Sequence, residues 1–123
     1  MIQANELRIG NYVSYKNERW IKVGYHEIRY AVLYPDNSYY PIPLTPEILE
    51  KAGFVKTGRY AIGAGGYITY EKDRVVLLHP KKGHPFVLAF HETQVQSVHQ
   101  LQNLYFALTG EELPINMVNQ VTP

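Results

Sequence analysis

The sequence predicts an α+β fold: an N-terminal antiparallel β-subdomain, then a helix, antiparallel strands and a C-terminal helix. Three observations support this. Short aromatic and β-branched runs alternate with turn-forming clusters up to residue 42, a helix start signal follows at Thr45, and apolar residues recur at helical spacing over 98–108. A chain of 123 residues can bury one real core, so we expect one compact unit, softly divided into 1–42, 43–113 and an arm or tail at 114–123.

The first subdomain is predicted to be β-structure over residues 7–42. Strands at Tyr12–Tyr15 and Arg19–Val23 flank a turn, and Tyr30–Tyr34 forms a further strand that ends at turn-forming residues. Residues Tyr39–Ile42 continue as an edge strand or linker, because the prolines at 41 and 43 cannot donate a ladder hydrogen bond. Short strands with close turns predict a small, barrel-like sheet of SH3-like size.

The first helix is predicted from its capping residues. Thr45 is a good N-cap, Pro46 suits the first helical position, and Glu47 lies near the positive end of the helix dipole. Gly53 suits the left-handed residue after the helix, and Phe54 can pack back onto its last turn.

The middle of the chain is predicted to return to strands. A hairpin joins Arg59–Ile62 to Tyr67–Tyr70 through the glycine turn 63–66. The apolar run within Arg74–His79 predicts a central strand buried on both faces, and Phe86–Phe90 predicts its neighbour.

The second helix is the most strongly marked element. Ser97 and Gln100 match the capping-box spacing, and Gly110 terminates the pattern. Its apolar side is formed by Val98, Leu101, Leu104, Tyr105 and Leu108.

Two stretches of the chain resemble a known family. Residues 6–13 contain Arg-Ile-Gly-Asn-Tyr-Val, and residues 98–113 read Val-His-Gln-Leu-Gln-Asn-Leu-Tyr-Phe-Ala-Leu-Thr-Gly-Glu-Glu-Leu. Together with the helix region 41–54, they resemble small uncharacterised proteins common in gut-type bacterial genomes and in their phages and prophages. The resemblance implies a phage or mobile-element origin and a cytoplasmic site of action. It carries no activity, so no functional residue is transferred.

Composition excludes several classes of protein. The absence of Cys excludes disulfide scaffolds, thiol catalysis and Cys-ligated metal centres. A net charge of +1 argues against bulk coating of nucleic acid. The N-terminus lacks the pattern of a signal peptide, and the longest apolar run, Val75–Leu78, is too short to span a bilayer. We therefore expect a soluble, cytoplasmic protein.

Catalytic motifs are missing from the sequence. There is no G-x-S-x-G elbow, and Ser14, Ser38 and Ser97 each have a structural explanation as strand, turn or cap. The glycine turn 63–66 lacks the spacing of a phosphate-binding loop. The sequence therefore predicts a protein that is not an enzyme.

A histidine cluster offers a metal site as an alternative to ordinary loop histidines. His79, His84, His91 and Glu92 fall within fourteen residues and could ligate a divalent metal. Two adjacent lysines would oppose a cation, so we expect no metal and no cofactor.

Tyrosine is the unusual feature of the composition. Ten of the eleven tyrosines precede residue 71, too many to bury entirely in so small a fold. Tyrosine beside Arg or Lys makes a recognition surface, with a rigid apolar ring and a hydroxyl. The predicted ligand-binding residues are Tyr30, Tyr34, Tyr39, Tyr40, Arg59, Tyr60, Lys81 and Lys82.

Two functions are consistent with this surface. The first is a non-enzymatic binding module of phage or mobile-element origin, whose tyrosine-rich β-surface engages a protein partner or a second copy. The alternative is a small-ligand binder, such as a phage anti-defence sponge that sequesters nucleotide signals. In it, tyrosines stack on bases while Arg59, Lys81 and Lys82 contact phosphates.

Overall fold

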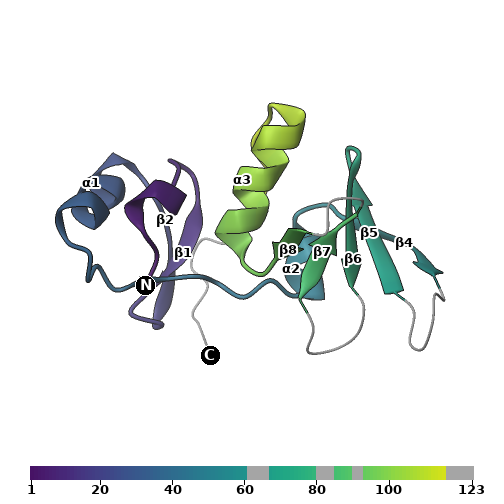
Figure 1. Cartoon of the computed structure of the whole chain (residues 1–123), viewed down its shortest axis with the longest axis horizontal. Helices are drawn as coiled ribbons and strands as arrows, with labels where there is room; N and C mark the ends of the chain where they lie inside the picture. The colour runs from purple at the N-terminus through teal and green to yellow at the C-terminus, as the bar shows by residue number, and fades with distance from the viewer. Residues whose placement is uncertain (61–66, 80–84, 90–92, 116–123) are drawn as a thin grey trace. The chain divides into compact units, whose positions relative to one another are not determined.

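The computed structural model describes residues 1–60, 67–79, 85–89 and 93–115, and it shows a mixed α+β protein with two antiparallel sheets (Figure 1). The α+β class predicted from the sequence is confirmed. In chain order the elements are η1 (Ala4–Glu6), β1 (Tyr12–Tyr15), β2 (Arg19–Lys22), α1 (Tyr25–Leu33), β3 (Tyr39–Tyr40), α2 (Pro46–Lys51), β4 (Val55–Tyr60), β5 (Tyr67–Lys72), β6 (Val75–His79), β7 (Phe86–Leu88), β8 (Thr93–Val95) and α3 (Val98–Thr109).

The chain divides into two compact units. Among the described residues, the first unit comprises Met1–Pro43 and Ser97–Leu104, and the second comprises Leu44–Gln96 and Tyr105–Ile115. Helix α3 therefore contributes to both units, whereas the sequence analysis placed all of it in the segment 43–113.

The first unit contains a three-stranded antiparallel sheet in the order β2-β1-β3. The turn between β1 and β2 places Lys16 and Asn17 at positive φ, and Glu18 N–H donates to the Tyr15 carbonyl at 3.0 Å. These are the features of a type I′ hairpin turn. Strands β2 and β3 are both edges of this sheet, so the barrel-like, SH3-like closure predicted for residues 1–42 is not confirmed.

Helix α1 replaces the strand predicted over Tyr30–Tyr34. Gly24 is its N-cap in an extended conformation, and Gly24 N–H donates to Glu27 Oε1 at 2.7 Å. The strand prediction was wrong because it followed the aromatic and β-branched composition. Tertiary contacts from Ile28 and Ala31, spaced three residues apart on one side of the helix, outweigh that local preference.

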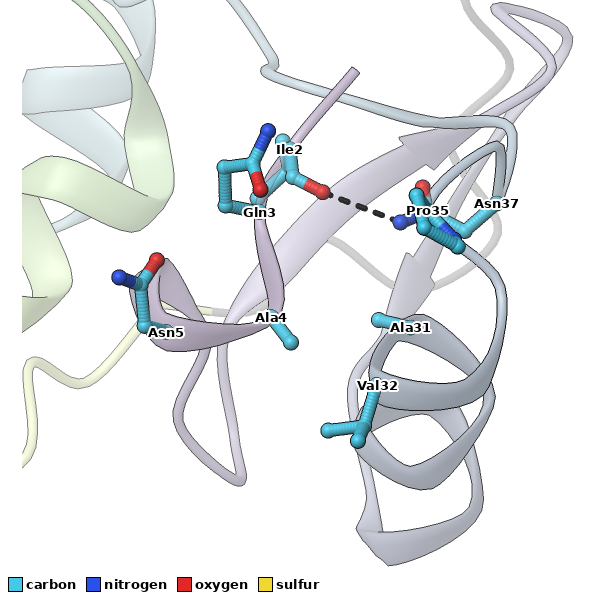
Figure 2. Close-up of a pocket in the computed structure, with 8 residues that line it drawn as sticks. All are labelled: Ile2, Gln3, Ala4, Asn5, Ala31, Val32, Pro35 and Asn37. Atoms are coloured by element: carbon cyan, nitrogen blue, oxygen red, sulfur yellow. Dashed lines mark hydrogen bonds between the residues drawn. The ribbon is translucent and has the colours of Figure 1, made fainter.

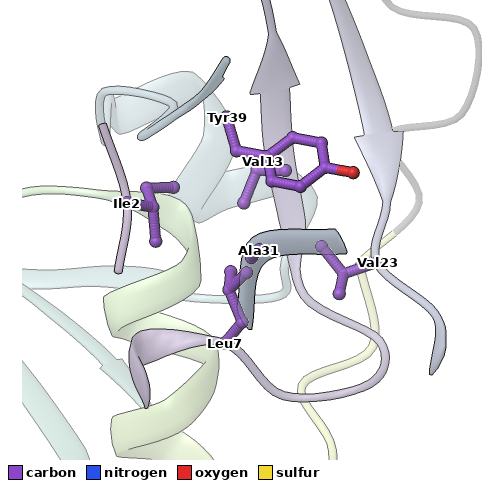
Figure 3. Packing of buried hydrophobic residues seen from close by; sticks show 6 residues of the cluster. All are labelled: Ile2, Leu7, Val13, Val23, Ala31 and Tyr39. Atoms are coloured by element: carbon purple, nitrogen blue, oxygen red, sulfur yellow. The ribbon is translucent and has the colours of Figure 1, made fainter. Parts of the chain in front are cut away.

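The core of the first unit is a cluster formed by Ile2 and Leu7 on either side of η1, by α1 and by one face of the sheet, as Figure 3 shows. Val13 and Val23 are almost completely buried, and Ala31 supplies the contact from α1. The buried members of the cluster are Ile2, Leu7, Val13, Val23, Ala31 and Tyr39.

Two side chains of α3 hold the N-terminal segment of the first unit. Tyr12 N–H donates to Gln102 Oε1 at 2.8 Å, and Gln102 Nε2 donates to the Gly10 carbonyl at 2.9 Å. Asn103 Oδ1 accepts from Asn11 at 2.9 Å and from Arg8 at 3.1 Å. These bonds satisfy polar groups that would otherwise be buried without a partner.

The second unit contains a five-stranded antiparallel sheet in the order β4-β5-β6-β7-β8. Strand β6 is central, as predicted, but only its alternate residues Val75 and Leu77 are buried, while Val76 and Leu78 are half-buried. The prediction of burial on both faces is therefore wrong. Strand β8 was not predicted from the sequence.

Helix α2 follows its sequence signals closely. Thr45 Oγ1 accepts from Ile48 N–H at 3.3 Å, and Pro46 begins the helix. Gly53 has φ +96°, and Phe54 N–H donates to the Leu49 carbonyl at 3.0 Å, which completes a Schellman motif. Among the described helices, none has the length and apolar character needed to cross a membrane.

Candidate functional site

Helix α1 exposes most of its apolar side chains. Within its nine residues only Ala31 is buried. Large apolar side chains on the helix and just after it remain exposed: Tyr25 at 64%, Val32 at 64%, Leu33 at 59%, Tyr34 at 53% and Tyr30 at 43%. Contiguous exposed apolar side chains of this kind make α1 a candidate interface.

Four exposed residues form a continuous strip on α1, which we call the α1 stripe: Tyr25, Arg29, Val32 and Leu33. Their spacings of three and four residues place them side by side on the helix surface. Among the described residues, no carboxylate lies within ion-pair distance of Arg29. The stripe therefore offers apolar contact area with one positive charge in its centre.

Four tyrosine rings form a second feature, which we call the tyrosine ladder: Tyr34, Tyr30, Tyr39 and Tyr15. Successive ring centroids are separated by 4.7 Å, 6.1 Å and 5.9 Å. These separations are typical of favourable aromatic pairs, each worth about 0.5–1.5 kcal/mol. The ladder connects α1 to the sheet through β3: Tyr34 and Tyr30 are exposed, Tyr39 is buried and Tyr15 is half-buried.

Two cations lie over the sheet end of the ladder. Lys16 Nζ lies 5.3 Å and the Arg19 guanidinium carbon 5.7 Å from the centre of the Tyr15 ring. At the buried step of the ladder, burial raises the pKa of Tyr39, and the nearby Glu27 carboxylate raises it further. The Tyr39 hydroxyl is therefore neutral at physiological pH and acts as a structural member of the ladder.

The structure brings together part of the predicted site. Tyr30 and Tyr34 are exposed on or beside α1. On β3, Tyr39 is buried, with only 6% of its surface exposed, and Tyr40 is half-buried. Arg59 and Tyr60 belong to the second unit, and their side chains lie outside the described residues, as do Lys81 and Lys82. The cations beside the ladder are instead Lys16 and Arg19, which the sequence analysis did not select.

A hollow of about 290 Å³ lies beside α1 in the first unit (Figure 2). Val32 and Pro35 contribute apolar surface, and Ala4 of η1 faces Ala31 of α1 across it. Asn37 Nδ2 donates to the Ile2 carbonyl at 3.0 Å, which ties the N-terminal segment to the loop after α1. Its full lining is Ile2, Gln3, Ala4, Asn5, Ala31, Val32, Pro35 and Asn37.

A Ser–His–Glu chain occurs at the start of α3. Ser97 Oγ lies 3.1 Å from His99 Nδ1, and His99 Nε2 lies 3.5 Å from Glu6 Oε1. Burial lowers the pKa of His99, while the Glu6 carboxylate partly offsets the shift. Ser97 is only 3% exposed and His99 only 2%, so neither offers a nucleophile to a substrate. The arrangement serves as a polar link between the N-terminal segment and α3.

The second unit contains a separate polar pair beside a smaller hollow. The Tyr105 hydroxyl donates to the Asp73 carboxylate, which raises the pKa of Tyr105 to about 12. The adjoining hollow encloses about 220 Å³ and is lined by Asp73, Arg74, Val75, Val76, Leu88, Ala89 and Leu108. The Tyr105 phenol stays neutral, and its hydrogen bond to the solvent-exposed Asp73 carboxylate stabilises the turn before β6.

The metal site considered from the sequence is only partly described. The His79 ring stacks on Phe86 with a centroid separation of 4.3 Å, while His84, His91 and Glu92 lie outside the described residues. Within the described part of the chain, no group of three or more His, Asp or Glu residues could hold a metal ion.

Comparisons with protein-family models, with curated proteins and with solved structures find no match to this chain.

Proposed function

We propose that this protein is a non-catalytic binding module whose α1 stripe and adjoining tyrosine ladder engage a protein partner. One observation carries the proposal: α1 exposes Tyr25, Tyr30, Val32 and Leu33 and buries only Ala31. Full burial of a large apolar side chain contributes about 1.5–3 kcal/mol, and each exposed side chain of α1 lacks this stabilisation. A partner that covers them recovers this free energy.

The chemistry of the surface suits protein recognition. Tyrosines lose little conformational entropy when they are immobilised, because only two torsions are fixed, and their hydroxyls can form hydrogen bonds at an interface. Arg29 lies within the α1 stripe, and Tyr and Arg are among the residues that dominate binding free energy at interfaces. The phage or mobile-element origin and the cytoplasmic site of action rest on the resemblance of residues 6–13 and 98–113 described above.

Site-specific photocrosslinking tests the proposal. A photoreactive amino acid at Leu33, 59% exposed, is compared with one at Leu108, 50% exposed in the second unit, in cells that natively produce the protein. We expect a crosslinked protein at position 33 and none at position 108. A product of twice the chain mass would identify the partner as a second copy. Equal or absent crosslinking at the two positions would refute the proposal.

The second candidate is the nucleotide binder, favoured by the two cations over Tyr15. A base would stack on exposed rings while Lys16 and Arg19 contact phosphates. A thermal-shift screen of cyclic and linear nucleotides, repeated on Arg19→Ala, separates the two functions. Stabilisation that Arg19→Ala abolishes would favour the nucleotide binder, and no stabilisation with any nucleotide would eliminate it.

A further inference from the structure

We propose that Tyr30 and Tyr34 form an oxidation site, at which a peroxidase with hydrogen peroxide joins the two rings into an intrachain dityrosine cross-link. The inference is independent of the proposed partner, because it needs only the two side chains and the oxidant. Their ring centroids are 4.7 Å apart, near the lower limit of the about 4.5–7 Å typical of aromatic pairs. Both rings are open to an oxidant, since Tyr30 is 43% and Tyr34 is 53% exposed.

Exposure selects this pair from the tyrosine ladder. Tyr39 contacts both Tyr30 and Tyr15, but its ring is buried. One-electron oxidation of a phenol releases the phenolic proton, and an exposed hydroxyl passes that proton to water. Burial and the nearby Glu27 carboxylate raise the pKa of Tyr39, so this hydroxyl retains its proton more strongly. Oxidation is therefore favoured at Tyr30 and Tyr34 over Tyr39.

The end of α1 holds the two rings together before any oxidation. Residues four positions apart are neighbours on a helix surface. Tyr34 is the C-cap of α1, and its N–H donates to the Tyr30 carbonyl at 2.8 Å. Coupling is therefore an intramolecular step between groups that are already close, which favours it over coupling between separate molecules.

The coupling balances in electrons and protons. Each tyrosine gives up one electron and its phenolic proton and becomes a phenoxyl radical. The two radicals join through ring carbons ortho to the oxygens, and each of these carbons then passes its hydrogen to the phenolic oxygen. The pair loses two electrons and two protons in all, which reduce one molecule of hydrogen peroxide to two of water. The new carbon–carbon bond spans the last turn of α1.

Oxidation of the purified full chain tests the inference. The protein is treated at low concentration with a haem peroxidase and hydrogen peroxide, and dityrosine fluorescence and intact mass are measured. Trypsin releases residues 30–51 as one peptide, because Arg29 and Lys51 are successive basic residues. A link between residues 30 and 34 removes two hydrogens from this peptide and suppresses fragments that break the chain between them. Oxidation of methionine adds oxygen instead, so mass separates the two reactions.

Three variants locate the link. Tyr30→Phe and Tyr34→Phe keep each ring but remove the hydroxyl that forms the radical. The matched control is Tyr25→Phe, because Tyr25 is 64% exposed on the same helix and its ring contacts His26. A further sample of the wild type is oxidised in urea at a concentration that unfolds the chain.

We expect cross-linked monomer in the wild type and in Tyr25→Phe, and its loss in Tyr30→Phe and Tyr34→Phe. The yield should also fall in urea, because the helix no longer holds the rings together. Dityrosine that is absent, confined to dimers or mapped to other residues would overturn the inference. So would an undiminished yield in either of the two variants, or an equal yield in the unfolded chain.

Discussion

Replacing Gln102 by Met should strongly destabilise the first unit. Strand β3 pairs with Ser14 and Tyr15 and ends before Tyr12, so the side chain of Gln102 satisfies the Tyr12 N–H in its place. The same side chain donates to the Gly10 carbonyl, and the residue is only 6% exposed. Met has a similar size and helix propensity, so the substitution removes both hydrogen bonds and little else.

The magnitude follows from the two main-chain groups that lose their partner. A buried unsatisfied group costs about 1–3 kcal/mol, so the buried Tyr12 N–H costs about 2 kcal/mol, and the part-buried Gly10 carbonyl costs about 1 kcal/mol because it regains some water. The added apolar contact of Met returns about 1 kcal/mol, and the net loss of about 2 kcal/mol is a large part of the roughly 5–15 kcal/mol typical of a folded domain. With a urea dependence of about 2 kcal/mol/M, the unfolding midpoint should fall by about 1 M.

The assay uses the single tryptophan of the chain, which lies in β2 of the first unit. Trp20 fluorescence therefore reports the unfolding of the unit that contains Gln102, while circular dichroism reports both units. The matched control is Gln100→Met, at an exposed position of the same helix. A loss below about 0.5 kcal/mol in Gln102→Met, or an equal loss in the control, would refute the role of these hydrogen bonds.

Three further substitutions test other parts of the structure. The pKa of His99 is lowered in the folded state from its ordinary 6.5, so folding stability should be complete above that pH and should decline as the pH falls below it. The substitution His99→Gln should flatten this decline. Urea midpoints that rise on acidification would contradict the prediction. Tyr105→Phe should lower the free energy of unfolding by only about 1 kcal/mol, because the exposed Asp73 carboxylate regains water when it loses its partner. In an absorbance titration the variant should lose the last tyrosine step, near pH 12. No change in that step would contradict the assignment. Gly53→Ala should cost about 1–2 kcal/mol in urea unfolding because φ is +96°, and a neutral effect would show that the turn can relax.

Local signals in the sequence predicted α2 well because its capping residues act within a few positions, and α3 because its apolar residues recur at helical spacing. A local signal of the same kind is present at the start of α1. Gly24 stands three residues before Glu27, and the two form the hydrogen bond that starts the helix. A glycine after a β-branched residue is also typical of a strand end, and the aromatic residues that follow favour a strand by composition. The contacts of Ile28 and Ala31 with the core decide between helix and strand.

The candidate site could be predicted only in part, because its geometry depends on contacts between distant residues. The excess of tyrosine correctly indicated exposed aromatic surface, but Tyr30 and Tyr34 lie on helix α1 and at its C-cap and not on the predicted β-surface. Their link to Tyr15 depends on the antiparallel pairing of β1 with β3, which places Tyr15 opposite Tyr39. No spacing in the sequence reveals that pairing, so Lys16 and Arg19 were missed.

The contrast between α1 and α3 strengthens the functional interpretation. Helix α3 also exposes apolar residues, Phe106 and Leu108, but it buries Val98, Leu101 and Tyr105. Helix α1 has nine residues, too few for a stable isolated helix, and it buries only one of them. Its start is held by the Gly24–Glu27 hydrogen bond and its end by the edge-to-face contact of Tyr30 with Tyr39. Positions where a sequence breaks a folding rule while the structure supports it locally are commonly functional, and α1 meets both conditions.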